Sequence, residues 1–308
     1  MSRIIGLQAP AQMDDAYMRG PLLLLSGRAN PSLSTEIGEL IGMSPDGATI
    51  KEFEDGEIFV RIEHNVRGRD VFILQPTSAP ADNIMELCLL IDAAKRASAA
   101  RVTAVIPYFG YGRQDRKDQP RVAIGAKLAA NLVVAAGADR VISIDFHQHQ
   151  IQGFFDIPVD HMYAAPVLTK YFRELGLGDL VVISPDVGAA KMARGYAKRL
   201  GAAFAIIDKR RPKANMSEVM NVVGEVDGKT CLLVDDMVDT GGSLSNGIRA
   251  LKDRGAKVVY AAATHALLSD GAAQRLQEAP VEEVIVTNTI RIAEEKRFEK
   301  LKVLSVAG

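Results

Sequence analysis

Residues 232–244 read LLVDDMVDTGGSL, an apolar run that ends in acidic residues and a glycine-rich turn. The apolar run is typical of a buried strand, and the segment SLSNGIRALKDRG at 243–255 is typical of a helix. Asp235, Asp236 and Asp239 crowd the point where the strand surfaces, although neighbouring carboxylates repel one another. The stretch therefore predicts a strand, a turn and a helix, with a ligand at the turn that compensates for the repulsion.

Similar apolar runs recur on both sides of this stretch. Most are nearly continuous in apolar residues, as expected for parallel strands that are covered on both faces. Helical segments such as IMELCLLIDAAKRASA at 84–99 separate many of them, and this alternation predicts α/β architecture. The runs are PLLLLSG at 21–27, DVFILQPT at 70–77, RVTAVIPYF at 101–109, RVISIDFH at 140–147, LVVISPD at 180–186, AAFAIID at 202–208, TCLLVDDMV at 230–238, KVVYAAATH at 257–265 and EEVIVTN at 282–288.

The length of 308 residues suggests two domains of ordinary size. A boundary near residues 150–165 divides the strands into two sets. We expect an N-terminal extension over 1–20, an N-terminal α/β domain over 21–160 and a C-terminal α/β domain over 161–308. Polar residues follow several strands, and ligand sites in such sheets form at the carboxyl ends of the strands.

Composition excludes several classes of protein. The net charge of −1 argues against a dedicated nucleic-acid binder, which usually carries a basic excess. No apolar run is long enough to cross a bilayer, and the N-terminus lacks a secretory signal. Cys88 and Cys231 lie in apolar stretches and are typical of buried thiols in a reducing compartment. These features predict a cytoplasmic protein that binds neither nucleic acid nor membrane.

The turn at Thr240–Ser243 suits a phosphate group. It offers backbone N–H groups, two hydroxyls and a helix N-terminus, and its glycines allow close approach. The acids beside it would repel phosphate, but they can accept hydrogen bonds from sugar hydroxyls. A sugar phosphate fits both halves, whereas the alternative is an N-capping turn with solvated acids.

The string DDMVDTGGS resembles the ribose-5-phosphate-binding loop shared by type I phosphoribosyltransferases and ribose-phosphate pyrophosphokinases. Four further stretches look like the pyrophosphokinase family in its common bacterial-type class. The similarity runs from about residue 21 to residue 306. The stretches are NVRGRDVFILQPTSAPADNIMELCLLIDAAKRASAARVTAVIPYFGYGRQDRK, DFHQHQIQGFFDIPVDHMYAAPVL, SPDVG and AIIDKRRPKANMSEVMNVVGEVDGK.

The resemblance implies a fold of two similar phosphoribosyltransferase-like domains, each a mainly parallel sheet flanked by helices. It implies transfer of the β,γ-diphosphate of ATP to the 1-hydroxyl of ribose 5-phosphate, with Mg²⁺ as cofactor. The products are 5-phosphoribosyl 1-diphosphate, a precursor in nucleotide biosynthesis, and AMP. It also implies a hexamer built from dimers, inhibited by ADP and activated by inorganic phosphate.

Two charged segments are expected to bind ATP by this resemblance. In RQDRKDQPR at 113–121, Arg113 and Gln114 would contact ATP from a mobile arm; the alternative is a solvated loop. FEDGE at 53–57 would hold the adenine of a neighbouring subunit's ATP; the alternative is a simple acidic turn. Its expected contact residues are Phe53, Asp55, Gly56 and Glu57.

Two strand ends carry expected metal ligands. If DFHQH at 145–149 stays extended, Asp145, His147 and His149 point to one face, which is a plausible divalent site. The resemblance supports His147 as a magnesium ligand, although Mg²⁺ prefers oxygen, and Asp186 as the second metal-binding position. A structural histidine and a helix-capping Asp186 are the alternatives.

The remaining expected residues surround ribose 5-phosphate and the reacting phosphorus. KRRPK at 209–213 could pass for a nucleic-acid patch or a solvated cluster. By resemblance, Lys209 stabilises the transition state at the attacked β-phosphorus and Arg211 contacts ribose 5-phosphate. Asp235 and Asp239 would bind ribose hydroxyls directly or through metal, and Asp236 stays unassigned. The 5-phosphate would be held by Thr240, Gly241, Gly242 and Ser243.

Two other functions remain as alternatives. A phosphoribosyltransferase that consumes phosphoribosyl diphosphate would share the DDMVDTGGS loop, but it would not explain FEDGE, RQDRK and DFHQHQIQ together. A non-catalytic paralogue would usually lose cleft residues, whereas Lys209, Arg211, His147 and Asp186 are present. Glu54, Ser243 and the stretch THALLSDGA at 264–272 depart mildly from the family pattern, and none removes an expected catalytic group.

Overall fold

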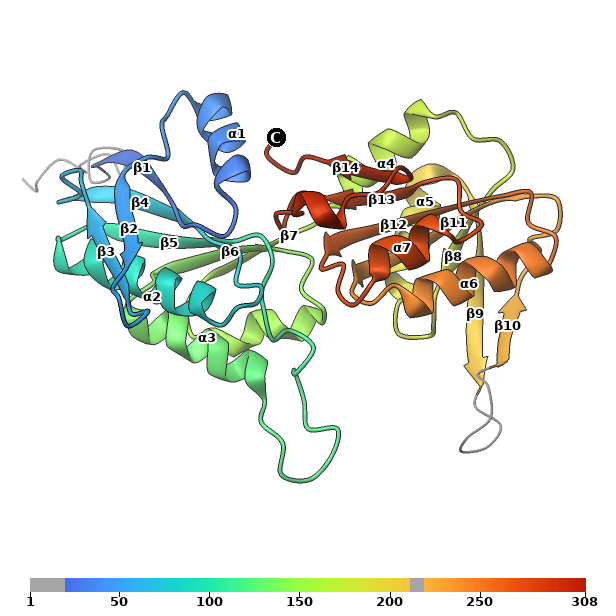
Figure 1. Cartoon of the computed structure of the whole chain (residues 1–308), viewed down its shortest axis with the longest axis horizontal. Coiled ribbons are helices and arrows are strands. Elements are labelled where there is room, and N and C mark those ends of the chain that lie inside the picture. The colour runs from blue at the N-terminus through green and yellow to red at the C-terminus, as the bar shows by residue number, and fades with distance from the viewer. Residues whose placement is uncertain (1–19, 211–218) are drawn as a thin grey trace, which may run out of the picture.

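A computed structural model describes residues 20–210 and 219–308 of the chain. The expected extension over 1–20, apart from Gly20, and the expected ligand Arg211 lie outside the described residues. The chain forms two sheets side by side, each flanked by helices, which confirms the α/β prediction (Figure 1). Within the described ranges, no helix combines the length and apolar character needed to span a membrane.

The N-terminal sheet has the strand order β1-β4-β5-β6-β7, and all its pairs are parallel. One face packs on α2 and α3, and α1 covers the other face together with residues 306 and 307. The strands are β1 (Gly20–Ser26), β4 (Arg69–Leu74), β5 (Arg101–Ile106), β6 (Arg140–Ile144) and β7 (Val159–Met162). The helices are α1 (Pro31–Ile41), α2 (Asp82–Arg96), α3 (Gly125–Ala136) and the 3-10 helix η2 (His149–Phe154).

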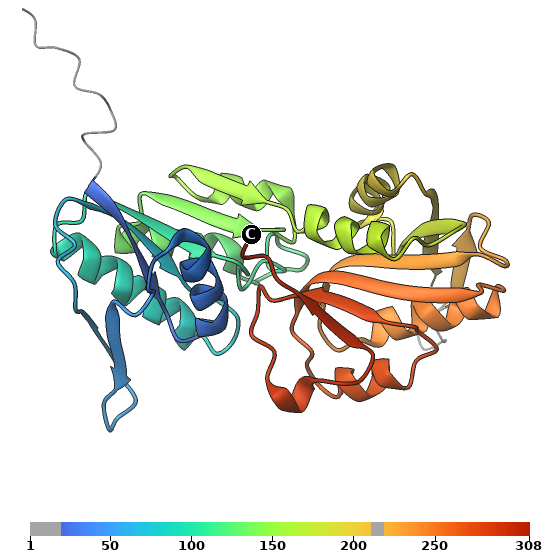
Figure 2. The same ribbon diagram turned by 90° about the horizontal axis from the view of Figure 1, so that it is seen from above.

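A two-stranded hairpin, β2 (Ala48–Glu52) and β3 (Ile58–Ile62), projects from this half of the molecule (Figure 2). It is antiparallel, and Ile50, Val60 and Ile62 are partly buried against the core that α2 helps to build. The apolar runs did not predict it, because only one side of each strand is covered and both strands are short.

The C-terminal sheet has the strand order β10-β9-β8-β11-β12-β13-β14, with only the β10–β9 pair antiparallel. Helices α6 and α7 pack on one face, and α4 and α5 pack on the other. The strands are β8 (Leu180–Ser184), β9 (Ala203–Arg210), β10 (Val219–Val223), β11 (Thr230–Val238), β12 (Val258–Ala266), β13 (Val284–Thr287) and β14 (Leu301–Leu304). The helices are α4 (Ala165–Glu174), α5 (Ala190–Leu200), α6 (Gly242–Asp253), α7 (Ala272–Gln277) and the 3-10 helix η3 (Glu294–Lys296).

Strand β11 lies in the middle of this sheet, between β8 and β12. Its residues Cys231 to Val234 are at most 1% exposed, because helices cover the sheet on both faces. This burial explains the continuous apolar run in the sequence. The strand surfaces at Asp235, and α6 begins four residues after the strand ends at Val238.

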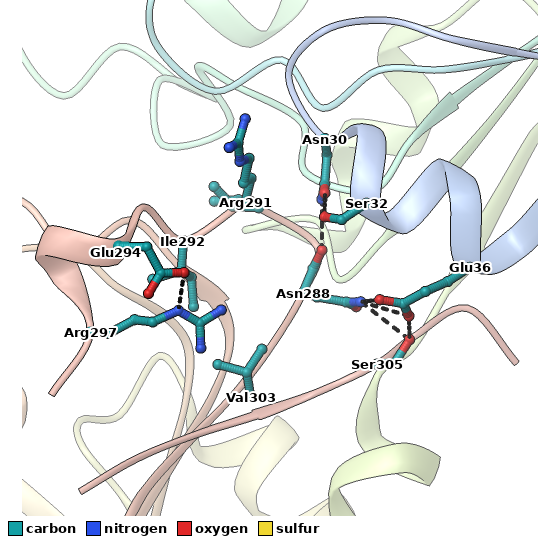
Figure 3. Close-up of a pocket in the computed structure, with 11 residues that line it drawn as sticks. Asn30, Ser32, Glu36, Asn288, Arg291, Ile292, Glu294, Arg297, Val303 and Ser305 are labelled. Carbon is teal, nitrogen blue, oxygen red and sulfur yellow. Dashed lines mark hydrogen bonds and ion pairs between the residues drawn. The ribbon is translucent and has the colours of Figure 1, made fainter. Parts of the chain in front are cut away.

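A polar seam joins the last strands of the chain to α1 (Figure 3). Asn30 Nδ2 donates to the carbonyl of Asn288 at 2.8 Å, and Asn288 Nδ2 donates to a carboxylate oxygen of Glu36 at 3.2 Å. Ser305 also donates to Glu36. These residues line a pocket of about 360 Å³, and the seam fastens the C-terminal segment to the first helix of the N-terminal half.

Candidate active site

The carboxyl ends of β5 and β6 in one sheet face the carboxyl end of β11 in the other. Two of the side-chain pairs that cross the junction involve the acids of the 235–239 stretch. Arg113 Nη1 lies 2.5 Å from Asp239 Oδ2, and His147 Nδ1 lies 2.6 Å from Asp236 Oδ2. The structure therefore brings an expected ATP residue and an expected metal ligand against the acidic stretch from which the sequence analysis began.

The turn after β11 leads into α6 through a glycine in the left-handed conformation. Gly241 has a φ of 70°, and a Cβ there would lie 3.3 Å from Leu276 Cγ, so a side chain would be both strained and crowded. As the N-cap of α6, Gly241 offers no side chain to the first N–H groups of the helix. Thr240 and Ser243 are exposed on either side. The turn thus presents a helix N-terminus and two hydroxyl side chains beside the acids.

The three acids have different environments. Burial, reinforced by the charge of Asp236, raises the pKa of Asp235 to about 8. Burial would also raise the pKa of Asp236, but the hydrogen bond and charge of His147 outweigh it and hold that pKa below its ordinary value. At Asp239, Arg113 likewise outweighs burial and lowers the pKa. A cation or a hydroxyl donor next to Asp235 would stabilise its ionised form, which burial disfavours.

His147 lies at the junction and is oriented by Asp236. A carboxylate can only accept, so Nδ1–H of His147 donates to Asp236 and Nε2 is left for another partner. This hydrogen bond raises the pKa of His147 despite its burial. A histidine whose second nitrogen binds a carboxylate is the common arrangement of a metal-binding imidazole.

The expected extended conformation of DFHQH is wrong. Strand β6 ends at Ile144, Asp145 has a φ of 41°, and η2 begins at His149. The carboxylate of Asp145 accepts from Thr264 Oγ1 at 2.7 Å and from the backbone N–H of Ala164 at 3.0 Å. His149 is exposed and packs beside His161 and Tyr163. The residues 145, 147 and 149 therefore do not form one metal-binding face.

Asp186 follows β8, the strand next to β11, and is half-buried. Its Oδ1 accepts from the backbone N–H of Ala189 at 3.0 Å, in the turn before α5, whose N-cap residue Ala189 makes no side-chain capping bond. Its charge adds to the raised pKa of Asp235, which lies on the neighbouring strand. Asp186 thus holds the turn before α5 through Oδ1, and its Oδ2 has no hydrogen-bond partner among the described residues.

The segment between β5 and α3 forms an arm over the junction and projects from the molecule in Figure 1. A pocket of about 360 Å³ is lined by this arm together with His147 and Gln148. Arg113 and Gln114 both line it. At the base of the arm, Gly110 N–H donates to Thr77 Oγ1 at 2.8 Å. The two expected ATP residues therefore share one pocket with the expected metal ligand.

The residues of FEDGE form the tip of the β2–β3 hairpin. Phe53 N–H donates to the Glu57 carbonyl at 2.9 Å, and Gly56 has a φ of 90°. Phe53 is 50% exposed, and Asp55, Gly56 and Glu57 are also exposed. Figures 1 and 2 place the hairpin on the side of the N-terminal sheet away from the C-terminal sheet, so this chain does not bring FEDGE to its own arm.

The backbone of Lys209 is paired in β9 opposite Met220 of β10. Arg211, the other expected residue of KRRPK, lies outside the described residues. The hairpin of β9 and β10 projects from the C-terminal sheet on the same side as the arm (Figure 1). The structure therefore gives the strand position of Lys209 and leaves its expected role a prediction.

Sequence reasoning missed the partner of His147. Asp236 stayed unassigned because three acids within five residues carry no signal of which one faces a histidine 89 residues away. It also missed His265, which lies buried at the end of β12 and contacts the loop that carries His147. The sequence did offer one signal for His265, because it is a polar residue near the end of a mainly apolar strand.

Comparison with known proteins agrees with these features. Residues 22–137 match the N-terminal domain of ribose phosphate pyrophosphokinase, and residues 209–307 match the phosphoribosyl synthetase-associated domain. The ribose-phosphate pyrophosphokinase of Fusobacterium nucleatum is 52% identical over 286 residues, which are 92% of this chain and 90% of that protein. The enzyme of the same name from Synechocystis sp. is 50% identical over 310 residues, covering 100% and 93% of the two chains.

A solved structure extends the agreement to the fold. The crystal structure of phosphoribosylpyrophosphate synthetase from Mycobacterium smegmatis superposes with a TM-score of 0.88 at 48% sequence identity, covering 94% of this chain and 95% of that one. This similarity supports the expected pair of phosphoribosyltransferase-like domains. Since relatives at half identity cover nearly the whole chain, the chain belongs to the ribose-phosphate pyrophosphokinase family.

Proposed function

We propose that the chain is a ribose-phosphate diphosphokinase. It transfers the β,γ-diphosphate of ATP to the 1-hydroxyl of ribose 5-phosphate, giving 5-phosphoribosyl 1-diphosphate and AMP for nucleotide biosynthesis. One observation carries the proposal: the acidic stretch and glycine turn of β11–α6 face Arg113 and His147 across the domain junction. The proposed sugar-phosphate site and the proposed polyphosphate site would then lie against each other, as a transfer between two substrates requires.

Ribose 5-phosphate is assigned to the C-terminal side of the junction. The N-terminus of α6 and the hydroxyls of Thr240 and Ser243 would hold the 5-phosphate, with Gly241 and Gly242 allowing close approach. Asp235 and Asp239 would accept hydrogen bonds from ribose hydroxyls. Arg211 would add a cation, and Asp239 would exchange its present partner Arg113 for the sugar.

ATP is assigned to the arm and to the hairpin. Arg113 and Gln114 would contact the polyphosphate from the pocket they line, and closure of the arm would exclude water from the transfer. Phe53, Asp55, Gly56 and Glu57 would hold adenine in a neighbouring subunit, because their hairpin projects away from this chain's own arm. The assignment therefore requires self-association.

The residues at the junction fit a divalent cation. Among the described residues, His147 Nε2 and the second carboxylate oxygen of Asp186 have no hydrogen-bond partner, and a cation would stabilise the charged form of half-buried Asp235. Among residues 20–210 and 219–308, no group of three or more His, Cys, Asp or Glu side chains is arranged to hold a metal alone. Mg²⁺ commonly takes substrate phosphates and waters as its remaining ligands. When bound, it would offset the charge that develops during phosphoryl transfer.

Lys209 is proposed to stabilise the transition state at the attacked β-phosphorus. A donor placed where charge develops contributes about 3–4 kcal/mol, so Lys209→Ala should lower turnover by at least about 100-fold. Lys198→Ala on the outer end of α5 is the matched control and should keep the parent rate. The measurement is AMP formation at saturating substrates, and near-parent turnover of Lys209→Ala would rule out this role.

Several wider assignments follow from the family. We propose two domains, as the sequence suggested with bounds of 21–160 and 161–308. Because β7 belongs to the first sheet and ends at Met162, and α4 begins at Ala165, we place the boundary between these two elements. We also propose a cytoplasmic hexamer built from dimers, inhibited by ADP and activated by inorganic phosphate. Sedimentation of the purified chain tests the assembly.

The deciding experiment is a coupled assay for AMP with ATP, Mg²⁺ and ribose 5-phosphate, run with and without inorganic phosphate. AMP that requires ribose 5-phosphate and no added base supports the diphosphokinase and excludes a phosphoribosyltransferase. A phosphate requirement adds the regulation. A folded protein that forms no AMP in either condition would instead be a non-catalytic paralogue.

A further inference from the structure

His265 is a buried histidine that bridges the two domains. It ends the apolar part of β12 and is 1% exposed. Its Nε2 lies 3.0 Å from the carbonyl oxygen of Asp145, and its Nδ1 lies 2.9 Å from Thr289 Oγ1. A carbonyl only accepts, so Nε2–H is the donor to Asp145 and Nδ1 accepts from the threonine. The ring of Tyr108 packs edge-on against it at 4.8 Å.

Asp145 is held in an unusual conformation by contacts from several directions. Its φ of 41° lies in the left-handed region, which persists in a non-glycine residue when its surroundings determine it. Its N–H donates to the Met162 carbonyl at 3.0 Å, and its carboxylate accepts from Thr264 and Ala164. The bond from His265 secures the remaining backbone group, the carbonyl.

His147 stands two residues beyond this point. Its ring is fixed at the other end by Asp236 of β11, and β11 is the direct neighbour of β12 in the C-terminal sheet. Asp236 and His265 therefore approach the same N-terminal-domain loop from adjacent strands of the other domain. One strand holds the ring of His147, and the next holds the backbone that carries it.

We infer that His265 is a positioning residue for the reaction: it fixes the Asp145 carbonyl across the domain junction and so aims the His147 ring. This inference rests on the proposed role of His147 as a metal ligand. It has a consequence for the site as a whole, since His147 is correctly placed only while the two domains are docked. Without His265, the Asp145 carbonyl would be buried without its donor and the turn would be free to relax.

Two substitutions separate positioning from mere packing. His265→Phe keeps an aromatic ring against Tyr108 but removes both hydrogen bonds. His265→Gln restores an N–H donor near the Nε2 position. The probe is Mn²⁺, titrated into the full chain with ribose 5-phosphate present so that substrate oxygens are available as ligands, and followed by its electron paramagnetic resonance signal.

We expect His265→Phe to weaken Mn²⁺ binding about 10-fold, the lower end for residues that orient a metal ligand. The Mg²⁺ concentration for half-maximal AMP formation should rise by a similar factor, while KM for ribose 5-phosphate stays unchanged. His265→Gln should recover most of the loss. Tyr171→Phe is the control, because it removes a 2.6 Å hydrogen bond to Glu283 in the same domain and should leave Mn²⁺ binding unchanged.

His147→Ala distinguishes a failure of the proposed metal site from a failure of the positioning role of His265. Mn²⁺ binding that is absent from the parent or survives in His147→Ala would refute the metal site itself. If His147→Ala abolishes Mn²⁺ binding but His265→Phe leaves it intact, only the role of His265 is overturned. The same holds if His265→Gln binds Mn²⁺ as weakly as His265→Phe. If His265→Phe fails to fold, Thr264→Val removes the hydroxyl bond to Asp145 and should weaken binding in the same direction; parent-like binding there overturns the inference.

Discussion

At the scale of single residues, adjacent acids have been given different surroundings by the fold. Asp235 and Asp236 are neighbours in β11, and the N–H of Asp236 even donates to Asp235 Oδ1 at 2.9 Å. Only Asp236 meets a histidine, and only its pKa is lowered, whereas burial raises the pKa of Asp235. Burial and the charge of Asp236 therefore raise the pKa of Asp235, whereas His147 across the junction lowers that of Asp236.

The partner role of Asp236 gives a first prediction. Asp236→Asn should raise the Mg²⁺ concentration needed for half-maximal activity by about 10–100-fold, because the amide cannot hold the His147 ring as the carboxylate does. The Mg²⁺ dependence of AMP formation measures this. Asp227→Asn, an exposed acid in the turn before β11, is the control. An unchanged Mg²⁺ dependence would contradict the role.

At the scale of elements, two projections carry the expected ATP residues: the hairpin and the arm. Both are ordered by backbone contacts at their bases or tips, and both leave their functional side chains exposed. Substitutions on their surfaces should therefore act on substrate binding, while substitutions at their bases should act on stability.

A substitution at the hairpin tip should act on substrate binding. Phe53→Ala should raise KM for ATP, since the ring is proposed to pack on adenine. It should change the free energy of unfolding little, because the side chain is 50% exposed and its main contact is the Phe59 ring at 5.7 Å. Leu40→Ala, a 65% exposed residue of α1, is the matched control. A parent-like KM would argue against the adenine contact.

A substitution at the base of the arm should act on the stability of the protein. A Cβ at Gly110 would lie 1.9 Å from the backbone oxygen of Thr77, so Gly110→Ala should destabilise the protein by about 1–3 kcal/mol and displace the arm. Denaturant unfolding and KM for ATP measure the two effects. Gly153→Ala has open space around its Cβ and should stay within about 0.5 kcal/mol of the parent. Equal stability of the two variants would refute the clash.

Whether a strand could be predicted from the sequence depended on how far the fold buries it. Strands covered on both faces, such as β8, β11 and β12, were predicted because burial forces continuous apolar runs. The edge strands β7 and β14 and the β2–β3 hairpin were missed, because partly exposed strands do not need a continuous run of apolar residues. At the site, the glycine turn was read from local pattern, but the conformation of Asp145 is set by Thr264 and His265, about 120 residues away.

At the scale of the whole molecule, the junction between the domains contains a group sensitive to pH. Burial lowers the pKa of His265 below its ordinary value of about 6.5. The folded protein keeps it neutral, whereas the unfolded chain takes up a proton below that pH. The stability it contributes is therefore complete above about pH 6.5 and is lost progressively as the pH falls towards the folded pKa.

The expected result is a free energy of unfolding that falls between pH 7 and pH 5. One such group accounts for up to about 1.4 kcal/mol per pH unit. Burial also lowers the pKa of His161, so the test is the difference in slope between the parent and His265→Gln. Denaturant unfolding at several pH values measures it, and equal slopes would show that His265 does not titrate on unfolding.

The packing of residues 306 and 307 on the first elements of the fold also bears on synthesis of the chain. Leu24, Leu33 and Leu74 form a buried cluster that is closed by Val306 and Ala307. At translation rates of about 5–20 residues per second, roughly 10–50 s separate the appearance of Leu74 from that of Val306. During that interval the nascent N-terminal domain presents an uncovered apolar face, which is the kind of surface that ribosome-associated chaperones hold.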